Sequence, residues 1–237
     1  MPSTESVLTF ARGPALYFAF AVFFLGMLRQ VGLTVAELVR AYGRAGDQVI
    51  PYRLLFRQSL GWIIPVNGLR GARVPYTMAS VAFHVGMLLV TLFLSGHVQL
   101  IEKGMGIAWP TLQPPVADVL TITTLAALVA LLLFRLGSRA LRFLSTFQDW
   151  FLLVLCMVPI LSGYYVSHPA GNPLPFWLTY LIHLLSAELL IILIPFTKLA
   201  HVVLFQFTRI SWELGWHFVP GAGERVRIAL GKEGEPV

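Results

Sequence analysis

The sequence predicts an all-α membrane protein with five transmembrane helices, and three observations support this fold class. The chain has 237 residues, of which 57% are hydrophobic and 12% charged, and its mean hydropathy is +0.77. These values exclude an ordinary soluble domain. Five apolar stretches are each long enough to cross a bilayer core about 30 Å thick. None of them alternates apolar and polar residues with period two, which argues against the strands of a membrane β-barrel.

The elements are expected in the following order along the chain. The opening "MPSTESVLTFARGPALYF" lacks the ordered basic, apolar and A-x-A parts of a cleavable signal peptide, so the first span is retained as a helix. A transmembrane domain covers residues 1–208, and residues 209–237 form a polar cytoplasmic tail. The five spans are predicted at residues 13–35, 76–100, 117–135, 149–167 and 175–208. In the connection of residues 37–75, the stretch "PYRLLFRQSLGWIIP" favours a helix on the cytoplasmic face or against a partner.

Basic residues gather in two of the connections between spans. Six arginines follow the first span and three follow the third, whereas the other two connections hold almost none. By the positive-inside rule, the N-terminus lies outside and the C-terminus lies in the cytoplasm. The net charge of +6 is thereby explained by topology and by attraction to the anionic inner leaflet, so we predict no nucleic-acid partner.

The single cysteine, Cys156, lies within the fourth span. One cysteine excludes an intrachain disulfide, a C-x-x-C-H haem attachment site and a cysteine-ligated iron–sulfur cluster within this chain. We therefore expect Cys156 to pack in the core.

Four of the six histidines lie within spans two and five, at two matched depths. His84 and His201 are expected near the cytoplasmic side, and His97 and His183 near the outer side. Neutral imidazole is a good axial ligand for haem iron. Two imidazoles, one from each of the two spans, would fill both axial positions of one haem. The four histidines therefore predict two six-coordinate haems in the bundle, which favour electron transfer over oxygen chemistry.

Helical geometry tests these two pairs. The 18 residues from His183 to His201 make five turns, which place both on one face of a straight helix about 27 Å apart. The thirteen residues from His84 to His97 rotate by roughly 220° beyond whole turns. Span two therefore requires tilt or a local distortion near Ser95 and Gly96.

Three stretches carry a resemblance to a known family. "FHVGMLLVTLFLSGH" in span two, "HLLSAELLIILIPFTKLAH" in span five and "FFLGMLRQ" in span one resemble the membrane cytochrome b (gamma) subunit of respiratory nitrate reductase. The family's wider relatives belong to heterodisulfide-reductase-like and hydrogenase complexes. The resemblance covers nearly the whole chain. It implies two b haems with His84, His97, His183 and His201 as the iron ligands, and electron exchange with a membrane quinone, either menaquinone or ubiquinone.

The resemblance also implies partners and a quinol site near the outer haem. The thirteen-residue spacing in span two is longer than in the nitrate reductase branch, which favours relatives whose partner is a cytoplasmic iron–sulfur or catalytic subunit. Lys103, beyond His97, is a candidate donor to a quinone oxygen, and Glu188 is a candidate proton carrier. The expected function is quinone-linked electron transfer in a bacterial or archaeal cytoplasmic membrane, by a subunit that does not act alone on the terminal substrate.

Two other classes of protein stay open. One is a transporter or proton channel that uses His, Glu and Lys as a relay, although the sequence indicates neither paired broken helices nor internal symmetry. The other is a haem-free membrane anchor whose histidines only pack. Tightly bound haem separates the cytochrome from both alternatives. His168 and His217, expected in a loop and in the tail, are given no role.

Overall fold

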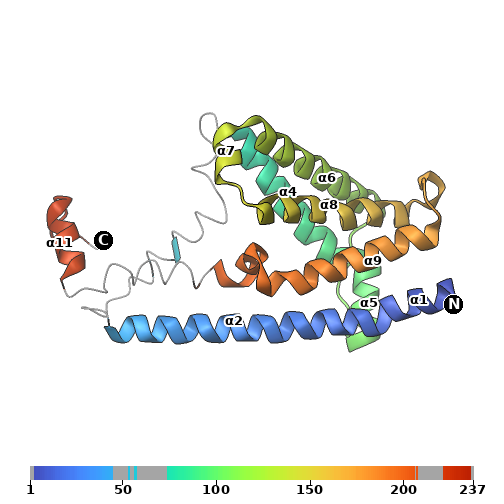
Figure 1. Ribbon diagram of the computed structural model, residues 1–237, viewed down its shortest axis with the longest axis horizontal. Coiled ribbons are helices and arrows are strands. Elements are labelled where there is room, and N and C mark those ends of the chain that lie inside the picture. Colours follow the sequence, from blue (N-terminus) through green and yellow to red (C-terminus); the bar gives the residue numbers. More distant parts are fainter. Residues whose placement is uncertain are drawn as a thin grey trace. The chain divides into compact units, whose positions relative to one another are not determined.

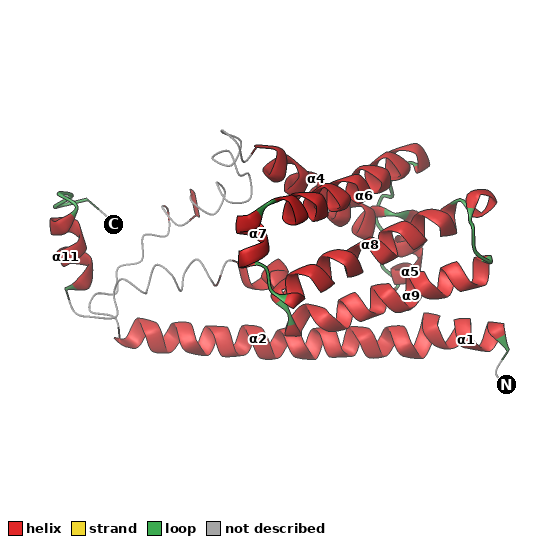
Figure 2. Cartoon of the chain, turned by 45° about the horizontal axis from the view of Figure 1, so that its top comes forward, coloured by secondary structure: helices red, strands yellow, loops and turns green. Residues whose placement is uncertain are grey.

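A computed structural model describes residues 3–44, 53, 56–57, 74–205, 207 and 221–235. The described residues form helices and no strand, as Figures 1 and 2 show. Five of the helices are long and apolar enough to cross a membrane, which confirms an all-α fold with five candidate spans. They are Thr4–Gly43, Val74–Phe93, Pro114–Gly137, Phe147–Ser167 and Phe176–Phe196. Most of the connection of residues 37–75, in which a surface helix is expected, lies outside the described residues; residues 37–44, 53, 56–57 and 74–75 are described. His217 also lies outside the described residues.

The chain divides into two compact units. The first contains residues 1–19 and 68–191, and the second contains residues 20–67 and 192–237. The tail expected at residues 209–237 belongs to the second unit, where the helix α11 (Ala222–Ala229) is described.

The first span is longer than the predicted 13–35. It joins α1 (Thr4–Phe10), the π-helical η1 (Ala11–Ala15) and α2 (Leu16–Arg44), and the 40 residues counted as the candidate span rise about 60 Å. Pro14 lies inside η1, where the wider turn accommodates a residue that lacks an N–H and crowds the preceding turn. Because a bilayer core is about 30 Å thick, this helix extends well beyond the hydrocarbon.

In the first unit, α6 (Pro114–Gly137) packs against both α4 (Val74–Phe93) and α8 (Phe147–Ser167), as can be followed in Figure 2. Buried residues recur along α6 at helical spacing and include Ala117, Thr121, Thr124, Leu128 and Leu131. The core forms around Leu128, Cys156 and Ile160. The predicted packing role of Cys156 is thus confirmed, since this side chain is buried.

Helices α4 and α6 approach closely at Gly86. A Cβ atom at this position would lie 1.9 Å from Oγ1 of Thr124, so only glycine fits without displacing the neighbouring helix. Thr124 is itself fully buried, and its hydroxyl donates to the Leu120 carbonyl at 2.7 Å. The polar atom is therefore satisfied within its own helix.

The other face of α6 is apolar and exposed. Val119, Ile122 and Leu133 are 63%, 53% and 60% exposed. An isolated soluble protein rarely presents such a continuous apolar surface, whereas lipid tails are the natural contact for it. The protein is accordingly a multi-pass membrane protein whose bundle contacts lipid.

Span two is interrupted rather than continuous over 76–100. α4 ends at Phe93, Leu94 adopts an extended conformation (φ −67°, ψ 134°), and α5 (Ser95–Met105) begins directly afterwards. The distortion expected near Ser95 and Gly96 is therefore confirmed, one residue earlier than predicted. His97 lies on α5, so the rotation calculated for one straight helix does not apply to it.

Span five is also interrupted, and its prediction as one helix over 175–208 is wrong. α9 (Phe176–Leu193) passes into the 3₁₀ turn η5 (Ile194–Phe196), Thr197 is extended (φ −130°, ψ −178°), and η6 (Lys198–Ala200) follows. Pro195 explains the stop, because it lacks an N–H and crowds the preceding turn. The expectation that His183 and His201 share one face of a straight helix is wrong for the same reason.

Both interruptions lie at or beyond the ends of the candidate spans Val74–Phe93 and Phe176–Phe196, and each precedes a histidine by a few residues. The expectation that the spans lack paired broken helices stays a prediction.

Candidate functional site

The side chain of His97 occupies the break in span two. Its Nδ1 lies 3.0 Å from the carbonyl oxygen of Thr91 and 3.3 Å from that of Val90. A helix end leaves its last four carbonyls without helical partners, and in a membrane such groups need partners from the protein itself. His97 therefore caps α4 while it sits in the first turn of α5.

The connection after α5 supplies the remaining partners. Nε1 of Trp109 donates to the Leu92 carbonyl at 2.7 Å, and the Leu112 amide donates to the Phe93 carbonyl at 2.8 Å. Together with His97, these donors account for the carbonyls of residues 90 to 93. The break at Leu94 is thus a satisfied structural feature, and it fixes where His97 lies.

His183 is held from the neighbouring helix α8. Its Nδ1 lies 2.9 Å from the Pro159 carbonyl oxygen, 24 residues away in the sequence. A Cβ atom at Gly163 would lie 2.9 Å from Cε1 of His183, so glycine leaves the space that the imidazole occupies. One turn of α8 therefore supplies both an acceptor and room for this ring.

The structure brings together the predicted outer pair. The rings of His97 and His183 have centroids 6.0 Å apart and planes that differ by 2°. The rings are parallel, but their separation exceeds a direct face-to-face contact of about 3.5–4 Å. Both residues belong to the first compact unit.

The two histidines of the predicted inner pair, His84 and His201, each have a backbone carbonyl as a partner. Nδ1 of His84 lies 2.7 Å from the Ser80 carbonyl oxygen, and its ring meets Phe83 edge-on at 4.8 Å. Nδ1 of His201 lies 2.6 Å from the Lys198 carbonyl oxygen. His84 belongs to the first unit and His201 to the second, so their pairing stays a prediction.

All four histidines share one hydrogen-bonding pattern. Because a carbonyl oxygen only accepts, Nδ1 of each ring is the donor. Histidine ligands of metals commonly donate their other nitrogen to a backbone carbonyl in this way.

The break in span five has its own support in the second unit. Nε2 of Gln30 donates to the Pro195 carbonyl at 2.8 Å. A Cβ atom at Gly26 would lie 2.7 Å from the Pro195 ring, so glycine at this point of α2 admits the proline. The hydroxyl of Thr197 donates to the Leu193 carbonyl at 2.8 Å.

The two proposed quinone or proton residues differ in their surroundings. Glu188 is 5% exposed, and its Oε1 has no hydrogen-bond partner in the described part of the chain. A carboxyl group buried in this way needs a proton or a polar partner. Lys103 is exposed in the last turn of α5, and no described contact links it to His97. Both roles stay predictions.

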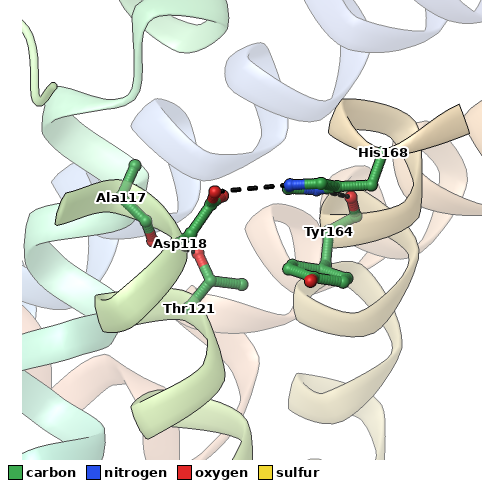
Figure 3. Close-up of polar contacts among 5 residues, drawn as sticks. All are labelled: Ala117, Asp118, Thr121, Tyr164 and His168. Carbon is green, nitrogen blue, oxygen red and sulfur yellow. Dashed lines mark hydrogen bonds and ion pairs between the residues drawn. The ribbon is translucent and has the colours of Figure 1, made fainter. Parts of the chain in front are cut away.

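The pair formed by Asp118 and His168 was not predicted from the sequence (Figure 3). Nε2 of His168 lies 3.3 Å from Oδ2 of Asp118. Asp118 is near the start of α6 and His168 caps the end of α8, so the antiparallel packing of these helices places them together. One signal in the sequence could have predicted this pair: Asp118 at the start of the third span and His168 after the fourth are titratable residues on the same predicted side of the membrane.

Three or more His, Cys, Asp or Glu side chains that could hold a metal ion do not gather anywhere in the described residues. A metal held by two imidazoles would need another group to complete its coordination. A haem would supply that group, and His97 and His183 would then be the residues that hold it.

The fold and these residues define a polytopic α-helical membrane protein in which His97 and His201 follow helix breaks. The chain is 34% identical over 204 residues to a protein of Nitratidesulfovibrio vulgaris described only as "Protein", and the match covers 84% of this chain and 89% of that one. This protein belongs to the same family as the Nitratidesulfovibrio vulgaris protein. Its description names no activity. No model of a known protein family matches the chain, and no solved structure matches it.

Proposed function

We propose that this protein is a dihaem cytochrome b subunit that transfers electrons between the membrane quinone pool and an iron–sulfur partner subunit. The observation that carries the proposal is the outer pair, in which His97 and His183 come from two helices with parallel rings 6.0 Å apart. Both Nδ1 atoms are engaged by backbone carbonyls. The resemblance of spans one, two and five to the nitrate reductase gamma subunit family supports the same function.

The ring separation is compatible with one metal between the two imidazoles. A metal–imidazole bond of about 2 Å, with roughly 1 Å more from the nitrogen to the ring centre, gives about 6 Å between centroids. Offset stacking of two aromatic rings covers centroid distances of about 4.5–7 Å, so the haem assay is the measurement that separates an axial ligand pair from a packing contact.

In this function, His97 and His183 hold the outer b haem, and His84 and His201 hold the inner one. When bound, the haems would supply one-electron redox chemistry. The protein's own residues orient the rings and exclude water. Quinol oxidation takes place near the outer pair, with Lys103 as donor to a quinone oxygen and Glu188 as proton carrier.

The partner subunit docks on the cytoplasmic face in this proposal, with the N-terminus of this chain outside. Arginines concentrate on the connections assigned to that face. There, α7 (Arg139–Leu144) places Arg139 and Arg142 beside Phe143, which is 88% exposed. The complex belongs to a bacterial or archaeal cytoplasmic membrane.

A pyridine haemochrome assay on the purified protein, with reduced-minus-oxidised spectra, tests the proposal. We expect two b haems per chain. The variants His84→Ala, His97→Ala, His183→Ala and His201→Ala should each lose one haem, since a pair cannot hold iron in six coordination after losing one ligand. His168→Gln is the matched control, because this histidine has a different hydrogen-bonding pattern and should keep both haems. A folded protein without haem would overturn the proposal.

A proton-relay transporter is the second candidate, and two observations favour it. The helices break at the ends of spans two and five, and Glu188 is buried with an Oε1 that has no hydrogen-bond partner among the described residues. The haem assay separates the two functions. A haem-free protein that carries protons across vesicle membranes, and loses this activity in Glu188→Gln, would establish the relay.

A further inference from the structure

His168 differs from His97 and His183 in how its ring is engaged. Nδ1 lies 2.9 Å from the Tyr164 carbonyl oxygen, and Nε2 lies 3.3 Å from Oδ2 of Asp118. Both ring nitrogens therefore face acceptors (Figure 3). At His97 and His183, the described partner is a backbone carbonyl at Nδ1.

A single residue, Tyr164, fixes the orientation of this imidazole. The Tyr164 ring stacks on the His168 ring with centroids 4.3 Å apart and planes 20° apart, and the Tyr164 carbonyl accepts from Nδ1. Figure 3 shows Asp118 opposite, on the neighbouring helix. Tyr164 and Asp118 are the titratable groups that the described contacts bring to His168.

The two acceptors around His168 can take hydrogen bonds from both ring nitrogens at once, which requires a protonated imidazole. A neutral imidazole has one N–H and can donate to only one of the two acceptors, whereas the imidazolium donates to both. The side chains of His168 and Asp118 are 38% and 39% exposed, so water can take the added proton away. The pair is therefore built to accept a proton and to release it to water.

The pair also lies close along α8 to the outer ligand pair. Gly163, which makes room for the His183 ring, precedes His168 by five residues. That spacing is about 7 Å along a helix. The pair sits toward the end of α8, the end that the sequence places outside.

We propose that His168 and Asp118 form the site that accepts protons when quinol is oxidised near His97 and His183, an inference that rests on the proposed function. A hydroquinone loses two electrons and two protons as it becomes the quinone. The two electrons would be accepted by the haems that the four histidines would hold under the proposed function. Nε2 of His168 takes one proton, releases it to outside water, and is then ready for the second.

The test follows haem reduction by a short-chain hydroquinone in stopped flow, between about pH 5 and pH 8. General acid–base groups typically contribute at least a hundredfold, and we expect His168→Ala to slow haem reduction by at least about tenfold. Imidazole added to the solution should restore part of that rate. Asp118→Asn should slow the reaction and change its pH profile.

Two controls separate a proton-accepting role from a structural one. Tyr165→Phe removes a neighbouring phenol hydroxyl but keeps the backbone carbonyl that accepts from the His168 amide, so its rate should equal that of the wild type. Each variant must retain two b haems with unchanged spectra, and His168→Gln replaces His168→Ala if the smaller side chain disturbs folding.

A second readout does not depend on haem. Diethyl pyrocarbonate modifies the unprotonated imidazole nitrogen, and mass spectrometry follows the reaction at His168. We expect Asp118→Asn to react several-fold faster, because Nε2 is no longer held against a carboxylate.

The outcomes distinguish the two proposals. If the wild type has no haem, or if the hydroquinone does not reduce it, the proposed function fails. If both haems are present and reducible, but His168→Ala reduces at the wild-type rate at every pH, the proton site is wrong while the cytochrome function stands.

Discussion

The two broken spans place their histidines by different means. At Leu94 the break has no proline, and the freed carbonyls are capped by His97 itself and by Trp109, 17 residues from the carbonyl it caps. At residues 195–197 a proline ends the helix, and the freed Pro195 carbonyl is capped by Gln30, 165 residues away. In the first case the candidate ligand helps to build the break. In the second, a separate helix supports it.

This difference predicts how each histidine depends on its surroundings. Substitution of His97 should remove the candidate ligand and also destabilise the break at Leu94, because the same imidazole caps α4. His201 should be sensitive to changes in α2, where Gly26 and Gln30 lie against Pro195. Each of the following substitutions tests one side of that contrast.

The largest expected effect is the loss of a haem. In redox titrations the wild type should show two steps. His183→Ala should lose the outer step and His201→Ala the inner step, so that each retains about half of the haem. If either variant lost both haems, the two sites would form one cooperative unit and the contrast between the breaks would not hold.

Steric changes at two glycines come next. Gly163→Ala places a Cβ 2.9 Å from Cε1 of His183, and Gly26→Ala places one 2.7 Å from the Pro195 ring. We expect each to lower stability by about 1–3 kcal/mol, the usual range for overpacking. Gly163→Ala should shift the spectrum and potential of the outer haem only, and Gly26→Ala those of the inner haem only.

Gly96→Ala is the matched control for these glycines. Gly96 lies two residues after the break, but nothing lies within 4 Å of a Cβ built there. The substitution should change the free energy of unfolding by no more than about 0.5 kcal/mol. A large effect would mean that backbone freedom at Gly96, rather than the capping of α4, maintains the break.

The smallest effects should come from the two capping donors. Trp109→Phe removes the donor to the Leu92 carbonyl, and Gln30→Met removes the donor to the Pro195 carbonyl. Each should cost about 1 kcal/mol of stability in detergent, the usual contribution of one hydrogen bond. Redox titration should show the outer potential moved by Trp109→Phe and the inner potential moved by Gln30→Met. Equal shifts of both haems in both variants would contradict separate support of the two breaks.

Several features were predictable because they depend on composition or on one residue. Five apolar stretches gave five candidate spans, since crossing a bilayer depends on length and hydropathy. The packing of Cys156 followed from its apolar surroundings. The stop at Pro195 was also readable from the residue, because proline cannot donate to the preceding turn, although span five was nonetheless predicted as continuous.

Other features depend on partners that local sequence does not reveal. The rotation between His84 and His97 signalled a distortion, but its position at Leu94 depends on Trp109 and Leu112 reaching back to α4. The length of the first span was underestimated because its polar continuation stays helical as far as Arg44. The pairing of Asp118 with His168 required the packing of α6 on α8.

From the amino-acid sequence alone, the apolar stretches predict a helical membrane protein with five candidate spans, because apolar length is a property of the chain itself. The folded structure shows which nitrogen of each of the four histidines a carbonyl engages, that span two ends at Phe93 with His97 beyond it, and that the rings of His97 and His183 are parallel with centroids 6.0 Å apart. Those outcomes depend on satisfying every freed carbonyl with a donor, and the donors become available only when distant segments fold together.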